Sequence, residues 1–223
     1  MNFCILIPVF NGAQTIRHII RGIKAFTSDI IIVNDGSTDD TKLIAQKQGV
    51  TILEHPENRG KGASLRTGFE YILKNTTFEY IMVMDADGQH SPKFIKDFLK
   101  VAEESKADLI IGNRMQDISN MPLIRRWTNK TMSFIISSLT RQSIPDTQCG
   151  YRLLKRRLLE NIKLETSNYD TESEILLKAT KKHFKIASVR ISTIYRGEKS
   201  NINPAVDTFR FIRLLIRLWV SLR

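Results

Sequence analysis

The chain of 223 residues is 42% hydrophobic and 26% charged, the composition of one ordinary globular domain, which excludes an intrinsically disordered chain. Its formal net charge of +11 is uneven, because residues 1–110 hold 13 of the 34 basic and 14 of the 23 acidic residues and residues 111–223 therefore carry +12. This asymmetry favours an anionic partner such as a phosphorylated substrate or an anionic membrane surface. Nucleic acid is not expected, because the sequence has no helix-turn-helix, zinc-finger or aromatic RNA-binding pattern.

Short apolar runs alternate with amphipathic stretches along the first half of the chain. The apolar runs predict strands at 3–8, 29–34, 50–54, 79–84 and 107–112, and the amphipathic stretches predict helices near 13–26, 38–48, 61–76 and 91–104. Alternation of this kind predicts βαβ units, hence a single α/β domain with a mostly parallel central sheet flanked by helices. No membrane-spanning helix is expected, because no window approaches about 18 uninterrupted apolar residues, and a secretory signal is not expected at the N-terminus.

The second half is less regular. It predicts a helix at 122–140, a strand or turn at 146–154, a helix at 170–183, a strand at 186–195 and a final helix from about residue 205. In that final helix, Arg210, Arg213 and Arg217 form one basic stripe on an otherwise apolar surface. The helix is too short and too charged to span a bilayer, but it suits the membrane interface. Packing in the core or between subunits is the alternative.

Two cysteines cannot form a disulfide framework, which indicates a reducing cytosol, and Cys4 is expected in the core.

Two carboxylates directly follow the apolar run at 79–84. Asp85 and Asp87 are separated by one residue, and the amide of Gln89 follows. Ligands of an open α/β sheet bind at the carboxyl ends of its strands. Oxygen donors suit Mg²⁺ or Mn²⁺, which proteins usually hold with one or two carboxylates and substrate phosphates. A turn or helix-cap role is the alternative for these aspartates.

Two other strand ends are expected at the same crevice. Pro8 and Phe10 follow the first strand, where Phe10 either stacks on a base or ribose or packs in the core. Asp35 ends the second strand, where it either accepts hydrogen bonds from a nucleoside or caps a helix. Neither a dinucleotide-binding G-x-G-x-x-G pattern nor a P-loop is present to bind phosphate.

Five segments in order along the chain resemble family 2 glycosyltransferases. They are Ile7-Pro8-Val9-Phe10-Asn11, Ile32-Val33-Asn34-Asp35-Gly36-Ser37, Asn58-Arg59-Gly60-Lys61-Gly62, Asp85-Ala86-Asp87-Gly88-Gln89-His90 and Gly112-Asn113-Arg114. The closest subgroup resembles dolichyl-phosphate mannosyltransferase and its bacterial polyprenyl-phosphate relatives. The resemblance implies a GT-A fold and a sugar transfer that inverts the anomeric centre.

The resemblance also implies roles for individual residues. The donor nucleotide-sugar would contact Pro8, Phe10, Val33, Asp35, Asp85, Ala86, Asp87, Arg114, Arg196 and Lys199, with a metal on Asp85, Asp87 and Gln89. The residues expected to carry the reaction are Asp87, Arg114, Arg126, Asp146 and Arg196. In the dolichyl-phosphate subgroup an acid usually follows the first asparagine, whereas Gly12 stands here. Both GDP-mannose and a UDP-sugar therefore remain open as donor.

The acceptor determines whether a general base is needed. A hydroxyl acceptor needs one, and Asp146 is the candidate. A polyprenyl phosphate is largely ionised at neutral pH and needs cations instead, which Arg125, Arg126, Lys130 and Arg152 are expected to supply. The basic second half favours the lipid phosphate. The alternatives are a hydroxyl of a glycan or lipid in cell-envelope polysaccharide synthesis, or a non-catalytic membrane-associated binding protein.

These inferences define a domain organisation and a location. Residues 1–203 are expected to form the glycosyltransferase domain, with a nucleotide-sugar half at 1–115 and an acceptor half at 116–203. Residues 204–223 are expected to form the amphipathic helix. The predicted protein is cytoplasmic and peripheral on the cytosolic face of a membrane, and the sequence leaves its oligomeric state open.

Overall fold

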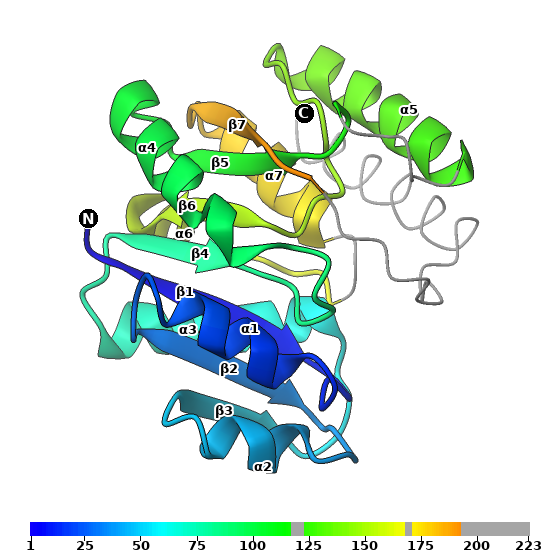
Figure 1. Ribbon diagram of the computed structural model, residues 1–223. Coiled ribbons are helices and arrows are strands. Elements are labelled where there is room, and N and C mark those ends of the chain that lie inside the picture. Colours follow the sequence, from blue (N-terminus) through cyan, green and yellow to red (C-terminus); the bar gives the residue numbers. More distant parts are fainter. Residues whose placement is uncertain (117–122, 168–170, 193–223) are drawn as a thin grey trace.

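The computed structural model describes residues 1–116, 123–167 and 171–192, which form a sheet covered by helices on both faces (Figure 1). The strands are β1 (Phe3–Val9), β2 (Ile30–Asp35), β3 (Thr51–His55), β4 (Tyr80–Val83), β5 (Leu109–Asn113), β6 (Arg152–Lys155) and β7 (Ile186–Arg190). The helices are α1 (Ile16–Ile23), α2 (Thr41–Gln46), α3 (Lys61–Asn75), the 3₁₀ helix η1 (Pro92–Phe94), α4 (Ile95–Ser105), α5 (Leu123–Thr140), α6 (Arg156–Asn161) and α7 (Thr171–Lys181). The final helix predicted from residue 205 lies outside the described residues.

The seven strands lie in the order β3-β2-β1-β4-β6-β5-β7. Strands β1 to β4 are parallel to one another, and β7 is parallel to β5. Strand β6 is antiparallel to both of its neighbours, β4 and β5. The mostly parallel sheet predicted from the sequence is therefore confirmed. The short helix α6, which no sequence pattern predicted, directly follows β6.

Alternating side chains of the strands build two separate core layers, because successive residues of a strand point to opposite faces. In β1, Ile5 and Ile7 pack on the face covered by α1 and α4, whereas Cys4 and Leu6 pack on the face covered by α3 and α7. Figure 1 shows α1 and α4 in front of the sheet and α3 behind it. Both faces are closed, so ligands can reach the sheet only at its edges and ends.

The helices present the apolar stripe that this arrangement requires. In α1 the buried residues are Ile16, Ile19, Ile20 and Ile23, which recur at the spacing of one helix face. In α5, Met132 and Ile136 face the core one turn apart. Within the described part of the chain, no helix is long and apolar enough to cross a membrane.

The direction of β6 positions the acceptor half of the chain. Parallel strands β1, β2, β4 and β5 all end at the same edge of the sheet, and an antiparallel strand begins there. Residues 146–151, which precede Arg152 at the start of β6, therefore lie beside the segments that follow β4 and β5. Both halves of the chain contribute side chains to this edge.

Candidate active site

A cavity of about 590 Å³ opens at the carboxyl edge of the parallel strands. It is lined by Pro8, Val9, Phe10, Asn11, Gly12, Gln14, Thr15, Asp35, Asn58, Gly60, Lys61, Ser64, Asp85, Ala86 and Asp87. Six of the ten residues predicted to hold the donor line it, namely Pro8, Phe10, Asp35, Asp85, Ala86 and Asp87. A cavity of this size is within the range of small-molecule sites.

Phe10 stands at this cavity with 48% of its surface exposed. The loop that follows β1 is tied to the start of α2 through the backbone. The amide of Asn11 donates to the hydroxyl of Ser37 at 2.9 Å, and the amide of Gly12 donates to that of Thr41 at 2.8 Å. The half-exposed ring of Phe10 therefore lines the cavity and does not pack in the core.

Asp35 is buried at the end of β2, where its carboxylate accepts hydrogen bonds from the segment that precedes α3. Its Oδ1 lies 2.6 Å from Nδ1 of His55 and accepts the amide of Arg59 at 3.0 Å, while its Oδ2 accepts the amide of Gly60 at 2.9 Å. Asp35 thus holds the backbone that enters α3, a contact that sequence reasoning did not foresee. The side chain of Val33 is fully buried in the core, so its predicted contact with a nucleoside is corrected to a packing role.

Lys61 connects Asp85, from the first half of the chain, with Glu172, from the second half. Its Nζ lies 2.6 Å from Oδ1 of Asp85 and 2.7 Å from Oε1 of Glu172, with all three side chains largely buried. Burial opposes the charge on Lys61, but Asp85 and Glu172 outweigh it and hold the lysine pKa above its usual value. Burial also opposes ionisation of Asp85, and Lys61 leads the charges that nevertheless hold its pKa low. The cluster thus places the amino group of Lys61 between the side chains of Asp85 and Glu172.

Asp87 is held close to Asp85 at the cavity wall, where its Oδ1 accepts the backbone amide of Gln89 at 2.9 Å. Among the described residues, no group of three or more His, Cys, Asp or Glu side chains is placed to hold a metal by itself. Two carboxylates on one cavity wall fit a divalent cation whose remaining ligands are substrate phosphates and water. The carboxylate oxygens of Asp85 and Asp87 therefore fit Mg²⁺ or Mn²⁺ bound together with a diphosphate.

Gly150 makes room for Asp85. A Cβ at this position would clash with the carboxylate of Asp85, so a side chain here would displace that group. The segment before β6 therefore packs its backbone directly against the first aspartate of the motif.

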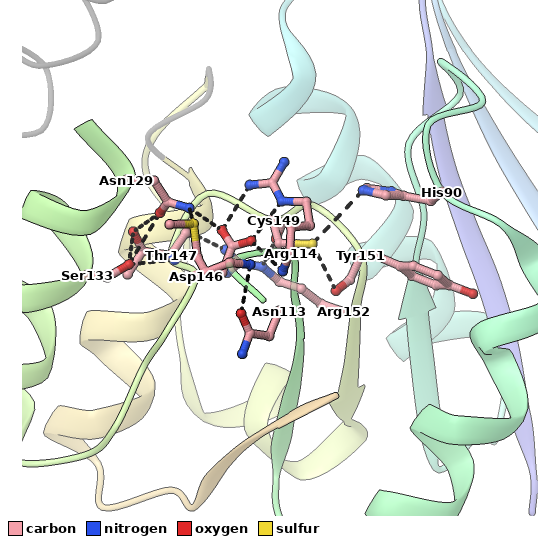
Figure 2. Close-up of polar contacts among 11 residues, drawn as sticks. His90, Asn113, Arg114, Asn129, Ser133, Asp146, Thr147, Cys149, Tyr151 and Arg152 are labelled. Atoms are coloured by element: carbon pink, nitrogen blue, oxygen red, sulfur yellow. Dashed lines mark hydrogen bonds and ion pairs between the residues drawn. The ribbon is translucent and has the colours of Figure 1, made fainter. Parts of the chain in front are cut away.

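Arg114 and Asp146 form a buried ion pair beside the cavity edge (Figure 2). Nε and Nη2 of Arg114 donate to the two carboxylate oxygens of Asp146 at 2.7 and 2.9 Å, and the amide of Asn129 in α5 adds a third bond at 2.8 Å. Burial opposes ionisation of Asp146, but Arg114 and Asn129 hold its pKa below the usual range. A carboxylate engaged in this way fixes Arg114 and is poorly suited to act as a general base.

Arg152 was predicted to bind phosphate, but the structure shows that its side chain is buried and engaged elsewhere. It is 1% exposed, and its guanidinium donates to the backbone carbonyls of Thr147, Cys149 and Glu172. Its contribution is to fix the loop before β6 and the start of α7. Arg126 in α5 is half-buried, whereas Arg196 and Lys199 lie outside the described residues.

His90 and Cys149 pack against each other as neutral groups, with 4.0 Å between Nε2 and Sγ. Burial lowers the pKa of His90 to about 4 and raises that of Cys149 to about 12. The His90 ring stacks on Tyr151 with a centroid distance of 5.2 Å. These groups pack beside the segment that follows Asp87.

Sequence reasoning missed the partners within the site rather than its main residues. Lys61 was part of a recognised motif without an assigned role, and Glu172 was not among the residues assigned to the site. Two acids at the start of an apolar helix were the available signal, but only Glu172 reaches Lys61. Glu174 instead accepts the backbone amides of Glu165 and Thr166.

Comparison with known proteins agrees with this architecture. A family model described as glycosyl transferase family 2 matches residues 4–163. An uncharacterized protein of Methanocaldococcus jannaschii is 34% identical over 197 residues, covering 86% of this chain and 81% of that protein. A protein of Methanococcus voltae named UDP-N-acetylglucosamine–dolichyl-phosphate N-acetylglucosaminyltransferase is 29% identical over 214 residues, covering 86% of this chain and 85% of that protein.

Solved structures share the fold. Glucosyl-3-phosphoglycerate synthase of Mycobacterium tuberculosis, crystallised with UDP, has a TM-score of 0.72 at 18% identity over 90% of this chain and 73% of that one. The same enzyme with Mn²⁺, UDP and phosphoglyceric acid has a TM-score of 0.74 at 17% identity, over 99% of this chain and 78% of that one. The likeness confirms the GT-A architecture expected from the sequence.

Proposed function

The chain belongs to glycosyl transferase family 2, and we propose that it transfers a sugar from a nucleotide-diphosphosugar to a polyprenyl phosphate, with inversion at the anomeric carbon. The proposed place of reaction is the cytosolic face of a membrane, with the protein bound peripherally. The observation that carries this proposal is the buried ion pair between Asp146 and Arg114. Asp146 is the predicted general base, but its carboxylate is bound to Arg114. An acceptor that is already nucleophilic therefore fits the site better than a neutral hydroxyl.

The cavity at the carboxyl edge is the proposed donor site. Phe10 supplies a face on which a base can stack, and Asp85 and Asp87 line the same cavity. Both UDP-sugars and GDP-mannose remain candidate donors. The UDP in the structural neighbours and the UDP-sugar in the name of the Methanococcus voltae relative support a uridine nucleotide.

A divalent cation, Mg²⁺ or Mn²⁺, is the proposed cofactor. Asp85 and Asp87, with Gln89, would hold it, and when bound it offsets the negative charge that develops on the departing diphosphate. Arg114 would add a positive charge near the same groups, because Asp146, to which Asn129 also donates, holds its guanidinium in place. Arg196 and Lys199, which lie outside the described residues, are proposed to act on the donor as well.

The acceptor side is proposed to bind phosphate through cations. An ionised phosphate monoester needs neutralisation and orientation rather than deprotonation. Arg126 in α5 is the proposed phosphate contact. The name of the Methanococcus voltae relative includes dolichyl phosphate, which supports a lipid phosphate as the acceptor class.

A transfer assay with matched acceptors tests the proposal. The protein is incubated with Mn²⁺ and a panel of UDP- and GDP-sugars, with a polyprenyl phosphate, the corresponding polyprenol or no acceptor. Mass spectrometry should detect a glycosyl phosphate lipid only with the phosphate acceptor. Transfer to the polyprenol at an equal rate would favour the hydroxyl alternative, and failure of every donor to bind would favour a non-catalytic protein. Arg126→Ala should raise the KM for the lipid phosphate more than that for the donor.

A further inference from the structure

The outer face of α5 carries the most exposed large apolar side chains in the described part of the chain. Leu123, Trp127 and Phe134 are 70%, 71% and 72% exposed, whereas the next most exposed, Leu43, is 49% exposed. A monomeric globular protein rarely leaves such side chains together on one surface without a partner.

These three residues form one stripe, called here the α5 stripe. At about 100° per residue, they fall within an arc of about 40° on the helix, and they extend over about 16 Å along its axis. Exposed Lys130 lies on the same side of the helix, at i+3 from Trp127 and at i−4 from Phe134. The opposite side of α5 is already used, because Met132 and Ile136 are buried in the core.

The charge around the stripe indicates what covers it. Residues 118–145 contain four basic residues and no acidic residue, and Lys130 lies within the stripe itself. An apolar strip of Trp, Phe and Leu beside cations matches the interface of an anionic bilayer, where aromatic rings lie at the headgroup level and lysine reaches the phosphates.

The same helix contacts the candidate active site from its inner side. Asn129 is 1% exposed and donates to Asp146, which holds Arg114 (Figure 2). A helix with its side chains is about 10 Å across, so a surface in contact with the α5 stripe lies about one helix diameter from this group. A phosphate on a membrane-anchored lipid is therefore within reach of the site.

We propose that the α5 stripe is a membrane-docking surface that binds an anionic bilayer. This inference draws on the proposed lipid acceptor, but it makes a separate claim, namely that Leu123, Trp127 and Phe134 enter the interface. The surface is distinct from the amphipathic segment predicted from residue 205 and does not depend on it.

The full-length protein offers a direct probe, because Trp127 and Trp219 are its two tryptophans. In a Trp219→Phe variant, Trp127 is the only tryptophan of the chain and therefore the only source of tryptophan fluorescence. Its emission should shift to shorter wavelength when vesicles of phosphatidylcholine with phosphatidylglycerol are added, and lipids brominated near the headgroup should quench it. Absence of both changes while the protein sediments with the vesicles would overturn the proposal, because another segment would then make the contact.

A second experiment compares vesicle co-sedimentation of three proteins. Trp127→Ser/Phe134→Ser should weaken binding to anionic vesicles about tenfold or more, whereas Leu43→Ser, an exposed apolar residue on α2, should not. Unchanged binding of the double variant would contradict the proposal. So would conversion of a wild-type dimer to a monomer by the double substitution, because the stripe would then join two copies of the chain.

A third measurement separates this inference from the proposed function. With a short, water-soluble isoprenyl phosphate in the absence of vesicles, the double variant should transfer sugar at the wild-type rate. If wild type itself does not use this acceptor, the proposed function fails while the vesicle result still decides the docking surface. If wild type uses it and vesicle binding is unaffected by the double substitution, only the docking surface fails.

Discussion

Replacement of Lys61 by Met tests the cluster that connects the two halves of the chain. In the wild type, Nζ of Lys61 lies 2.6 Å from Asp85 and 2.7 Å from Glu172. Methionine keeps most of the length and apolar contact of the side chain but removes its charge. Two carboxylates would then share a largely buried site without a cation, because only 22% of the Asp85 side chain and 6% of that of Glu172 are exposed.

The expected loss of stability is large. Removal of one partner from a buried ion pair typically costs about 3–5 kcal/mol, because the remaining charge is left uncompensated. For a chain of this size each kcal/mol lowers Tm by about 2–4 °C, so Lys61→Met should lower Tm by about 6–20 °C. A Lys61→Met/Glu172→Gln double variant should recover part of this loss, since only one carboxylate then remains charged.

The chain offers a matched control in Lys42. Its Nζ lies 2.9 Å from Glu54, but 48% of its side chain is exposed. Exposed pairs contribute about 0–1 kcal/mol, so Lys42→Met should change Tm by about 4 °C at most. Thermal and urea unfolding, read by circular dichroism, measure both variants.

Metal adds a second readout to the same experiment. If Asp85 and Asp87 bind a divalent cation, Mn²⁺ with a nucleoside diphosphate should raise the Tm of Lys61→Met more than that of wild type, because the metal supplies the missing positive charge. Equal unfolding of Lys61→Met and Lys42→Met would refute the reasoning about the buried cluster. An identical metal-induced shift in Lys61→Met and wild type would refute its link to the metal site.

Three further predictions concern the edge of the cavity. Gly150→Ala should lower metal-dependent turnover by about a hundredfold while the fold is kept, because its Cβ displaces Asp85, whose position decides the geometry of the site; turnover within a factor of two of wild type would contradict this. Asp146→Asn should lower stability at neutral pH and flatten its acid dependence. The pKa of Asp146 is lowered in the folded state, so its stabilisation is present above the unfolded value of about 3.9 and is lost as pH falls below it; urea unfolding at pH 7, 5 and 3 measures the slope, and an unchanged slope would count against the Arg114 pair. Phe10→Ala should weaken nucleotide binding about tenfold through loss of base stacking, as measured by isothermal titration calorimetry, and equal affinity would show that the ring does not contact the base.

Local patterns in the sequence predicted most of the fold. Alternating apolar runs and amphipathic stretches placed the strands and helices of residues 1–113 close to their observed positions. The antiparallel direction of β6 was not predictable in this way, because a strand of four residues carries no signal for the direction of its neighbours. The six-residue helix α6 is likewise too short to show a periodicity.

The candidate site was predictable where it depends on strand ends. Pro8 lies near the end of β1, and Phe10, Asp85 and Asp87 follow strands of a parallel sheet, whose carboxyl ends necessarily meet at one edge. Individual roles were predictable only in part. Charge alone indicated that Arg152 binds phosphate, but its burial and its bonds to three carbonyls depend on tertiary packing.

Pairings between distant residues were the least accessible to sequence reasoning. Lys61 begins α3 and Glu172 lies near the start of α7, and only the folded sheet brings the two helix N-termini together. Arg114 and Asp146 were both selected as reactive groups, and their mutual ion pair changed the interpretation of Asp146 from base to partner.

The most direct test of the account is release of nucleoside diphosphate from a UDP- or GDP-sugar in the presence of Mn²⁺, with and without a polyprenyl phosphate, by wild type and by Asp87→Ala. The account predicts release that requires the lipid phosphate and that falls by about 10²–10³ in the variant, the loss typical of removing one charge-stabilising group. Release at the same rate without the lipid phosphate, or undiminished release by Asp87→Ala, would contradict it.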